Sequence, residues 1–119
     1  MTIKIQAIVE FMKNNLARKL TLDEIGKSVG LSRSHVCYLF KAEYDISPGQ
    51  YLKILRMEKA REMLDNSFLN IKEIMAKVGI QDQSHFTRDF KRLYSVTPSE
   101  YREHRQAANS PENSTGEAK

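Results

Sequence analysis

Hydrophobic residues in this chain recur three and four positions apart, in short runs separated by glycine, proline or helix-capping residues. In residues 70–78 this spacing is kept by Ile71, Ile74, Met75 and Val78. The pattern predicts a helix of about two turns, with Asn70 and Glu73 forming a capping box at its start. Gly79 can take the left-handed conformation that ends such a helix.

A second helix is predicted from near Gln83, because Asp82 offers a carboxylate as its N-cap. On this helix Phe86, Phe90 and Leu93 share one face, which we expect to be buried. The opposite face is polar with cationic ends and carries Ser84, Thr87, Arg88 and Lys91. Two short helices joined through a glycine turn indicate a helix-turn-helix unit.

This unit occurs twice, since residues 21–51 repeat the pattern of residues 70–101. Up to the turn the offset is 49, so that Glu24, Ile25, Val29, Gly30 and Leu31 correspond to Glu73, Ile74, Val78, Gly79 and Ile80. After one inserted residue it is 50, and Ser34, His35, Phe40, Lys41, Tyr44, Pro48 and Tyr51 correspond to Ser84, His85, Phe90, Lys91, Tyr94, Pro98 and Tyr101. Two copies are too few for a solenoid, and therefore favour paired modules.

Three further stretches complete an all-α fold of about seven helices, with two tandem helix-turn-helix modules joined by a long linking helix. An amphipathic helix is expected from residue 3 to about residue 17. Ser47 and Pro48 open the linking helix, which ends near Asn66 and is roughly 28 Å long. Pro98 opens the last helix. We expect a first module over residues 1–46, the linking helix over 47–66, a second module over 67–106 and a disordered tail over 107–119.

Composition narrows the functional classes. The chain has 119 residues, 40% of them hydrophobic, and a formal net charge of +4, which favours a polyanionic partner. One cysteine provides no disulfide framework, and no apolar run approaches the roughly 18 residues of a membrane span. We expect a cytoplasmic protein that has no contact with a membrane.

Two segments carry a resemblance to a known family: LRMEKAREML in the linking helix and VGIQDQSHFTRDFKRLYSVTPSEYR in the second module. With the doubled pattern, residues 3–105 resemble the DNA-binding domain of AraC/XylS-family bacterial transcription regulators. The resemblance implies that recognition helices at about 33–43 and 83–94 enter adjacent major grooves of double-stranded DNA. Base-reading residues would be Ser34, Cys37, Tyr38, Gln83, Ser84, His85, Thr87 and Arg88. Phosphate-binding residues would be Arg33, Lys41, Lys91 and Arg92.

The family also implies partners beyond DNA. Its members usually attach this domain to a sensing or dimerising domain, and RNA polymerase is a further candidate partner. No cofactor and no metal ion are expected.

The chain departs from the family pattern at six positions, and two of these are Cys37 and Tyr38, which stand where long polar or basic side chains are usual. Gly26 and Met75 stand where an alanine usually faces the recognition helix, and a larger residue there shifts helix docking. Asp45 and Ser95 stand where a helix-ending glycine is usual, so each must adopt a left-handed conformation.

Individual residues keep alternative interpretations. Arg88 can read guanine or contact a phosphate, and Gln83 can read adenine or cap its helix. His35, His85 and Cys37 are residue types that bind zinc. Zinc sites need clustered ligands, however, and the two histidines belong to different modules. Cys37 can be a redox sensor, or it can be an inert residue that only fills space.

The exposed face of the recognition helices distinguishes the competing functions. The alternative to a DNA-binding domain is a small helical protein-interaction module without DNA binding, whose exposed face should be apolar. Gln83, Arg88 and Lys91 are polar or cationic there, which favours DNA. No nucleophile with a base, useful carboxylate pair or phosphate-binding glycine loop is visible, so we expect no enzyme.

Overall fold

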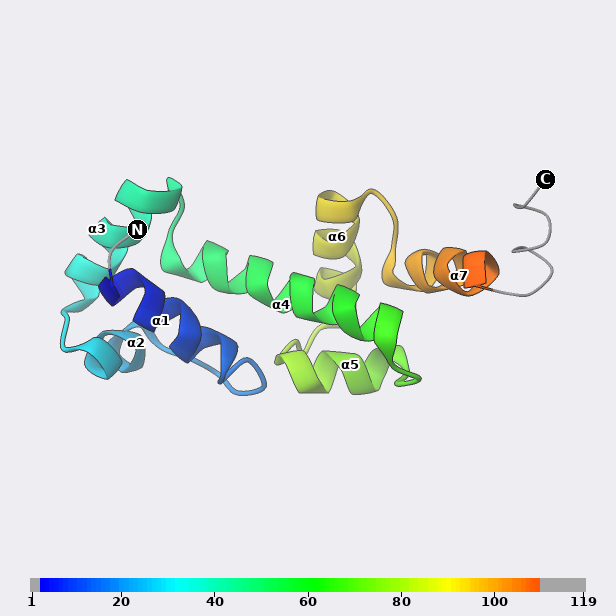
Figure 1. Cartoon of the computed structure of the whole chain (residues 1–119), viewed down its shortest axis with the longest axis horizontal. Helices are drawn as coiled ribbons and strands as arrows, with labels where there is room; N and C mark the ends of the chain where they lie inside the picture. The colour runs from blue at the N-terminus through cyan, green and yellow to red at the C-terminus, as the bar shows by residue number, and fades with distance from the viewer. Residues whose placement is uncertain (1–2, 110–119) are drawn as a thin grey trace.

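The computed structural model describes residues 3–109, and this part of the chain contains seven α-helices and no strand. They are α1 (Ile3–Lys13), α2 (Leu22–Val29), α3 (Arg33–Tyr44), α4 (Pro48–Asn66), α5 (Ile71–Val78), α6 (Gln83–Tyr94) and α7 (Pro98–Asn109). The predicted all-α fold is confirmed. Figure 1 shows α4 running between an N-terminal half (α1–α3) and a C-terminal half (α5–α7), with α3 and α6 on the same side of α4.

Side-chain caps set where the helices begin. The predicted capping box at α5 is present: the Glu73 amide donates to Asn70 Oδ1 at 2.8 Å, and the Asn70 amide donates to Glu73 Oε1 at 2.8 Å. Ser47 and Gln50 form the same box at α4. At α2, Thr21 accepts from the Glu24 amide, but the Glu24 carboxylate instead pairs with Arg18 at 2.7 Å.

The first helix is shorter than predicted: α1 ends at Lys13 and does not continue to about residue 17. The Asn15 side-chain amide donates to the Phe11 carbonyl at 2.7 Å, an example of a short polar side chain competing with the helical backbone pattern. Turns follow, yet Leu16 stays buried at 7% exposure. The apolar periodicity of the predicted helix therefore extends to a buried residue that lies beyond the end of α1.

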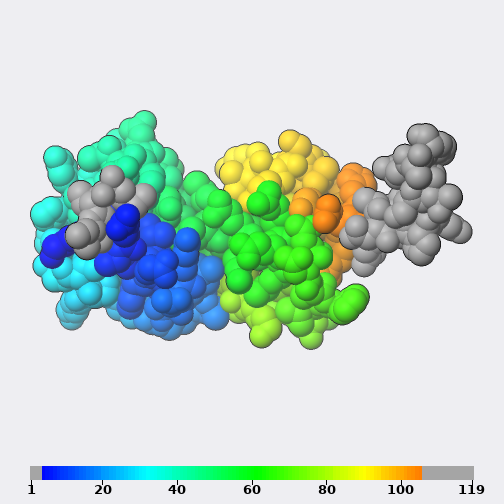
Figure 2. All heavy atoms as spheres, viewed as in Figure 1, coloured from blue at the N-terminus to red at the C-terminus, as the bar shows by residue number. Residues whose placement is uncertain are grey.

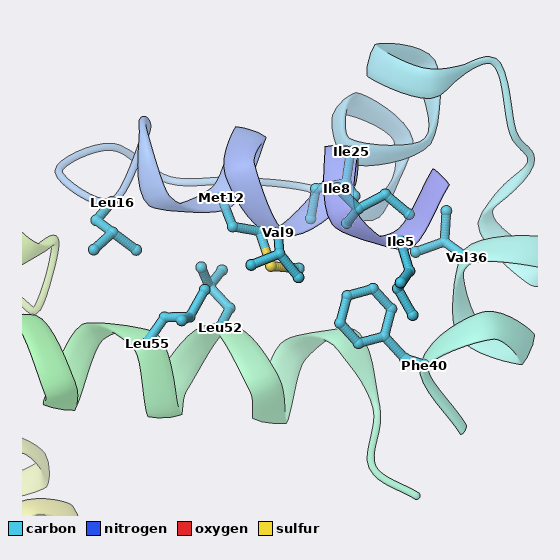
Figure 3. Packing of buried hydrophobic residues seen from close by; sticks show 10 residues of the cluster. All are labelled: Ile5, Ile8, Val9, Met12, Leu16, Ile25, Val36, Phe40, Leu52 and Leu55. Carbon is cyan, nitrogen blue, oxygen red and sulfur yellow. The ribbon is translucent and has the colours of Figure 1, made fainter. Parts of the chain in front are cut away.

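Two hydrophobic cores share the linking helix. The N-terminal core packs α1 against α2, α3 and the first half of α4, as Figure 3 shows for Ile5, Ile8, Val9, Met12, Leu16, Ile25, Val36, Phe40, Leu52 and Leu55. The C-terminal core contains Met57, Ala60, Leu64, Ile74, Met75, Val78, Phe86 and Phe90. Opposite ends of α4 thus complete different cores.

An aromatic cluster closes the end of each recognition helix. The ring centroid of Phe40 lies 5.3 Å from that of Tyr51 and 5.7 Å from that of Tyr44. Burial and the neighbouring Tyr44 raise the pKa of Tyr51 to about 12. The C-terminal half repeats this cluster with Phe90, Tyr94 and Tyr101. Because these rings cover Phe90, Leu93 remains 44% exposed, and the prediction that it is buried was wrong.

The two halves also touch each other directly, through residues that we call the inter-half contact: Leu16, Arg18, Arg56 and Gly79. The Gly79 backbone lies so close to the Leu16 carbonyl that a Cβ at residue 79 would stand 1.9 Å from its oxygen. Beside it, Arg56 of α4 donates from Nη2 to the Arg18 carbonyl at 3.0 Å. Burial of this guanidinium lowers the pKa of Arg56. The orientation of the halves therefore depends on this contact as well as on α4.

The last helix is tied to the carboxyl end of α4. Arg102 donates to the carbonyl oxygens of Met63, Ser67 and Leu69. Asp65 accepts from the Tyr101 hydroxyl at 3.0 Å and pairs with Arg105 at 2.8 Å. The helix continues to Asn109 and so includes the first three residues of the segment expected to be a tail, whose remaining residues lie outside the described part.

The expected left-handed residues are found. Asp45 and Ser95 have φ angles of 61° and 71°, and Gly30 and Gly79 have 70° and 77°. A Cβ at Gly26 would lie 2.3 Å from the Leu31 carbonyl oxygen, so glycine allows a close turn there. At the corresponding position of α5, Met75 is buried in the C-terminal core.

Candidate nucleic-acid interface

The start of α6 is fixed by its N-cap. Asp82 accepts from the His85 backbone amide at 3.0 Å, and this hydrogen bond lowers the pKa of the Asp82 carboxyl. His85 Nδ1 lies 3.9 Å from the other Asp82 oxygen. The first turn of α6 is thereby held in place while Gln83 and Ser84 remain exposed to solvent.

Four of the five residues predicted to read bases from α6 meet in one shallow depression. It is lined by Gln83, Ser84, Thr87 and Arg88. Thr87 is half-buried and the others are exposed, while Phe86 and Phe90 anchor the opposite side of the helix in the core. His85 is exposed but lies outside this depression and lines a larger groove beside it.

The exposed face of α3 is less polar. Ser34 is exposed, Cys37 is half-buried and Tyr38 is 68% exposed. The His35 ring meets Tyr38 edge-on, with 6.3 Å between the ring centroids. This face therefore offers a hydroxyl, a thiol and an aromatic ring, which suit apolar contacts better than bidentate hydrogen bonds.

The predicted phosphate-binding cations lie at the surface. Arg33 pairs with Asp23 at 3.7 Å, and Lys41 pairs with Asp45 at 3.4 Å. Arg92 lies 3.9 Å from an Asp89 oxygen, and Lys91 is exposed near the end of α6. The pairs made by Arg33 and Lys41 are exposed on both sides. Surface ion pairs of this kind contribute little to stability, so these two cations can exchange their partners for phosphates at small cost.

The structure also contains features that the sequence did not indicate. An open groove of about 1170 Å³ lies between α4 and the turn leading into α6, and it is lined by Lys19, Lys53, Arg56, Lys72, His85, Arg88, Asp82 and Asp89 among others. Asp89 is 6% exposed, and Lys53 reaches it from α4. The space-filling view shows the surface drawn in over α4, between α3 and α6 (Figure 2). Asp89 lies three positions after Phe86 and directly before Phe90, so it falls beside the buried face of the helix, and this spacing was the available signal for a buried carboxylate.

Other kinds of site find little support in the described residues. Within residues 3–109 no three histidine, cysteine or acidic side chains gather as metal ligands would. His35 and His85 are each exposed, on different recognition helices. No helix in this part of the chain has the length and hydropathy needed to cross a bilayer.

Comparisons with known proteins agree with this geometry. A family model described as a helix-turn-helix domain matches residues 25–104. The chain is 31% identical over 100 residues to the multiple antibiotic resistance protein MarA of Escherichia coli, covering 84% of this chain and 79% of MarA. The chain belongs to the AraC/XylS family. Its relatives are transcription regulators, and the resemblance stated from the sequence is confirmed.

Two further relatives show how much of a longer regulator and of a solved domain this chain covers. The lactose operon transcription activator of Staphylococcus xylosus is 35% identical over 100 residues, covering 84% of this chain. The chain spans only 36% of that relative's length. A solved AraC-type transcriptional regulator from Chromobacterium violaceum superimposes with a TM-score of 0.81 at 29% identity, over 91% of this chain and 94% of the solved one.

Proposed function

We propose that this domain of a sequence-specific DNA-binding transcription regulator places α3 and α6 in two adjacent major grooves of one duplex. The observation that carries the proposal is the position of α3 and α6 on the same side of α4 (Figure 1), with the hydrophobic face of each helix buried and its opposite face exposed. The major groove returns to the same face of B-DNA every 34 Å or so. A linking helix of 19 residues, roughly 28 Å long, is of that order.

In this proposal base edges are contacted by residues exposed on both recognition helices: Ser34, Cys37, Tyr38, Gln83, Ser84, His85, Thr87 and Arg88. Phosphates are bound by Arg33, Lys41, Lys91 and Arg92. Arg88 is the strongest candidate for readout, since a guanidinium can donate two hydrogen bonds to guanine. The polar and cationic face of α6 supports DNA over a protein partner, which would favour an apolar surface.

The proposed modules are residues 1–46 and 67–106, joined by residues 47–66. Because their recognition helices differ in sequence and are joined in tandem, one chain should occupy an asymmetric site. The proposal extends to a cytoplasmic regulator that works with RNA polymerase and with a sensing domain outside this chain. The match to only part of a longer transcription activator supports the last point.

Selection of duplexes from a random DNA pool tests the proposal. The expected result is one enriched, non-palindromic site of about two major-groove segments, bound by a single chain in analytical ultracentrifugation. Enrichment of no sequence would refute sequence-specific binding. A symmetric site that requires two chains would refute the tandem arrangement.

A further inference from the structure

Asp89 is the one charged side chain that is buried among the described residues. It lies in the middle of α6, directly after Arg88, and is surrounded by cations. Its Oδ1 atom is 3.4 Å from Arg88 Nε and 3.9 Å from Arg92 Nη1, and its Oδ2 atom is 3.5 Å from Lys53 Nζ on α4. The three cationic side chains are each more than half exposed, so they approach the buried carboxylate from the solvent side.

We propose that Asp89 is a positioning residue, which holds the Arg88 guanidinium ready for base recognition. The contact with Asp89 engages Nε, and the guanidinium has two further nitrogens that can donate to guanine O6 and N7. Fixing a long side chain before binding reduces the conformational entropy lost on binding. This inference rests on the proposed function, because it assigns a role within the same DNA-reading surface.

The repeat within the chain argues against a purely structural role. With the offset of 50 that aligns Phe40 with Phe90, Asp89 corresponds to Leu39 and Arg88 corresponds to Tyr38. Leu39 packs against the N-terminal core. The same helix therefore forms with an apolar residue at this position, and the carboxylate is found in the copy that carries the arginine.

A second carboxylate, Asp82, also attracts Arg88 through its charge, but its hydrogen bond is made elsewhere. Asp82 lines the same groove, but its oxygens face the backbone amide and the ring of His85. Lys53 contacts the Asp89 oxygen that Arg88 does not use. Lys53 thus ties α6 to α4 through the same carboxylate, and the two contacts can be removed separately.

A carboxylate close to bound DNA repels phosphates irrespective of base sequence. Replacing Asp89 by asparagine should therefore strengthen binding to scrambled DNA. If Asp89 positions Arg88, the same change should strengthen cognate binding less, or weaken it. The ratio of cognate to scrambled affinity is therefore the informative quantity, since a purely electrostatic effect raises both affinities equally and leaves the ratio unchanged.

The experiment is a double-mutant cycle with Asp89→Asn, Arg88→Ala and the double variant. The selected duplex and a scrambled duplex of equal composition are titrated at one salt concentration by fluorescence anisotropy. Asp89→Asn should lower the affinity ratio at least about threefold in the wild-type background and leave it unchanged in the Arg88→Ala background, the non-additivity of groups that act together. Lys53→Gln is the matched control, and should keep the ratio even where overall affinity changes.

If circular dichroism shows that Asp89→Asn does not fold, Asp89→Leu takes its place in the cycle. This variant introduces the residue type found at the corresponding position of the other half. An unchanged ratio in Asp89→Asn, or an equal drop in both backgrounds, overturns the inference. Those results leave the proposed function intact. The proposed function fails separately if the wild-type chain binds the selected and scrambled duplexes equally.

Discussion

At the scale of single residues, the proposed DNA-reading face of α6 allows two kinds of contact to be tested separately. Arg88→Ala should cost about 1 to 3 kcal/mol on the cognate duplex and relax preference at one base pair, because it removes a bidentate donor. Lys91→Ala should weaken binding to all DNA sequences alike. It should also lower the salt dependence of the affinity by about one released counterion. Anisotropy titrations on cognate and scrambled duplexes over a salt series distinguish them. Equal losses on both duplexes for Arg88→Ala would rule out base reading by this residue.

Gly79 and Gly30 form a matched pair for testing the inter-half contact. Both have positive φ angles, but a Cβ at Gly30 meets nothing within 4 Å, whereas one at Gly79 would lie 1.9 Å from the Leu16 oxygen. Gly30→Ala should cost about 1 kcal/mol, the penalty of a left-handed alanine. Gly79→Ala should cost about 1 to 3 kcal/mol more, because backbone must shift. Urea unfolding gives both values, and equal losses would mean that the halves do not press together at this point.

Residue exposure could be predicted from the sequence to a large extent, because period and repeat assign each side chain to a face. Periodicity was misleading at Leu93, which is exposed because rings from α6 and α7 cover the core in its place. The ion pair between Lys53 and Asp89 was not predicted either, because it depends on how α4 and α6 dock. The two residues are 36 positions apart in the sequence. Contacts of this kind follow from tertiary packing and have no local signature.

At the scale of helices, caps and glycine turns predicted where most elements begin and end. The exception was α1, where the apolar spacing continued to Leu16 while Asn15 bonded to the backbone and ended the helix. A hydrophobic pattern indicates which residues are buried, and here the pattern continues beyond the end of the helix. Hydrogen-bond competition decides such boundaries, and apolar periodicity contains no information about it.

The attachment of α7 to α4 gives a prediction at the same scale. Arg102 donates to three carbonyls around the end of α4, where a cation also meets the negative end of the helix dipole. Arg102→Ala should lower the free energy of unfolding by about 2 kcal/mol, the range of hydrogen bonds from charged groups. Arg105→Ala is the control: its ion pair with Asp65 is more exposed, so its loss should be below about 1 kcal/mol. Urea denaturation of both variants checks the order, and a larger loss for Arg105→Ala would contradict the assignment.

The two recognition helices should contribute unequally to sequence discrimination. Substitutions at base pairs under α6 should cost about 1 to 3 kcal/mol each, whereas those under α3, facing Cys37 and Tyr38, should cost nearer 1 kcal/mol. The measurement is a base-by-base substitution scan of the selected site, with the helices located by footprinting. DNA bending can create preferences that no side chain reads. Penalties under α3 that equal those under α6 would count against this division.

At the scale of the whole molecule, the inter-half contact should make the domain strict about the spacing of its two DNA segments. One base pair inserted between them turns one segment relative to the other by about 34°. Because α4 and the inter-half contact hold the halves together, we expect the duplex to bear the distortion, with affinity falling at least about tenfold, or 1.4 kcal/mol. Competition between the selected duplex and its one-pair insertion and deletion variants measures the effect. Unchanged affinity would show that the halves pivot freely.

The linking helix also has a consequence for the growing chain during synthesis. Residues 48–66 leave the ribosome before residues 71–101. We therefore expect one end of α4 to complete the N-terminal core while Met57, Ala60 and Leu64 of the second core still lack partners. Exposed apolar surface of this kind attracts chaperones and neighbouring chains. We therefore expect the half-made protein to expose the surface on which its second half assembles.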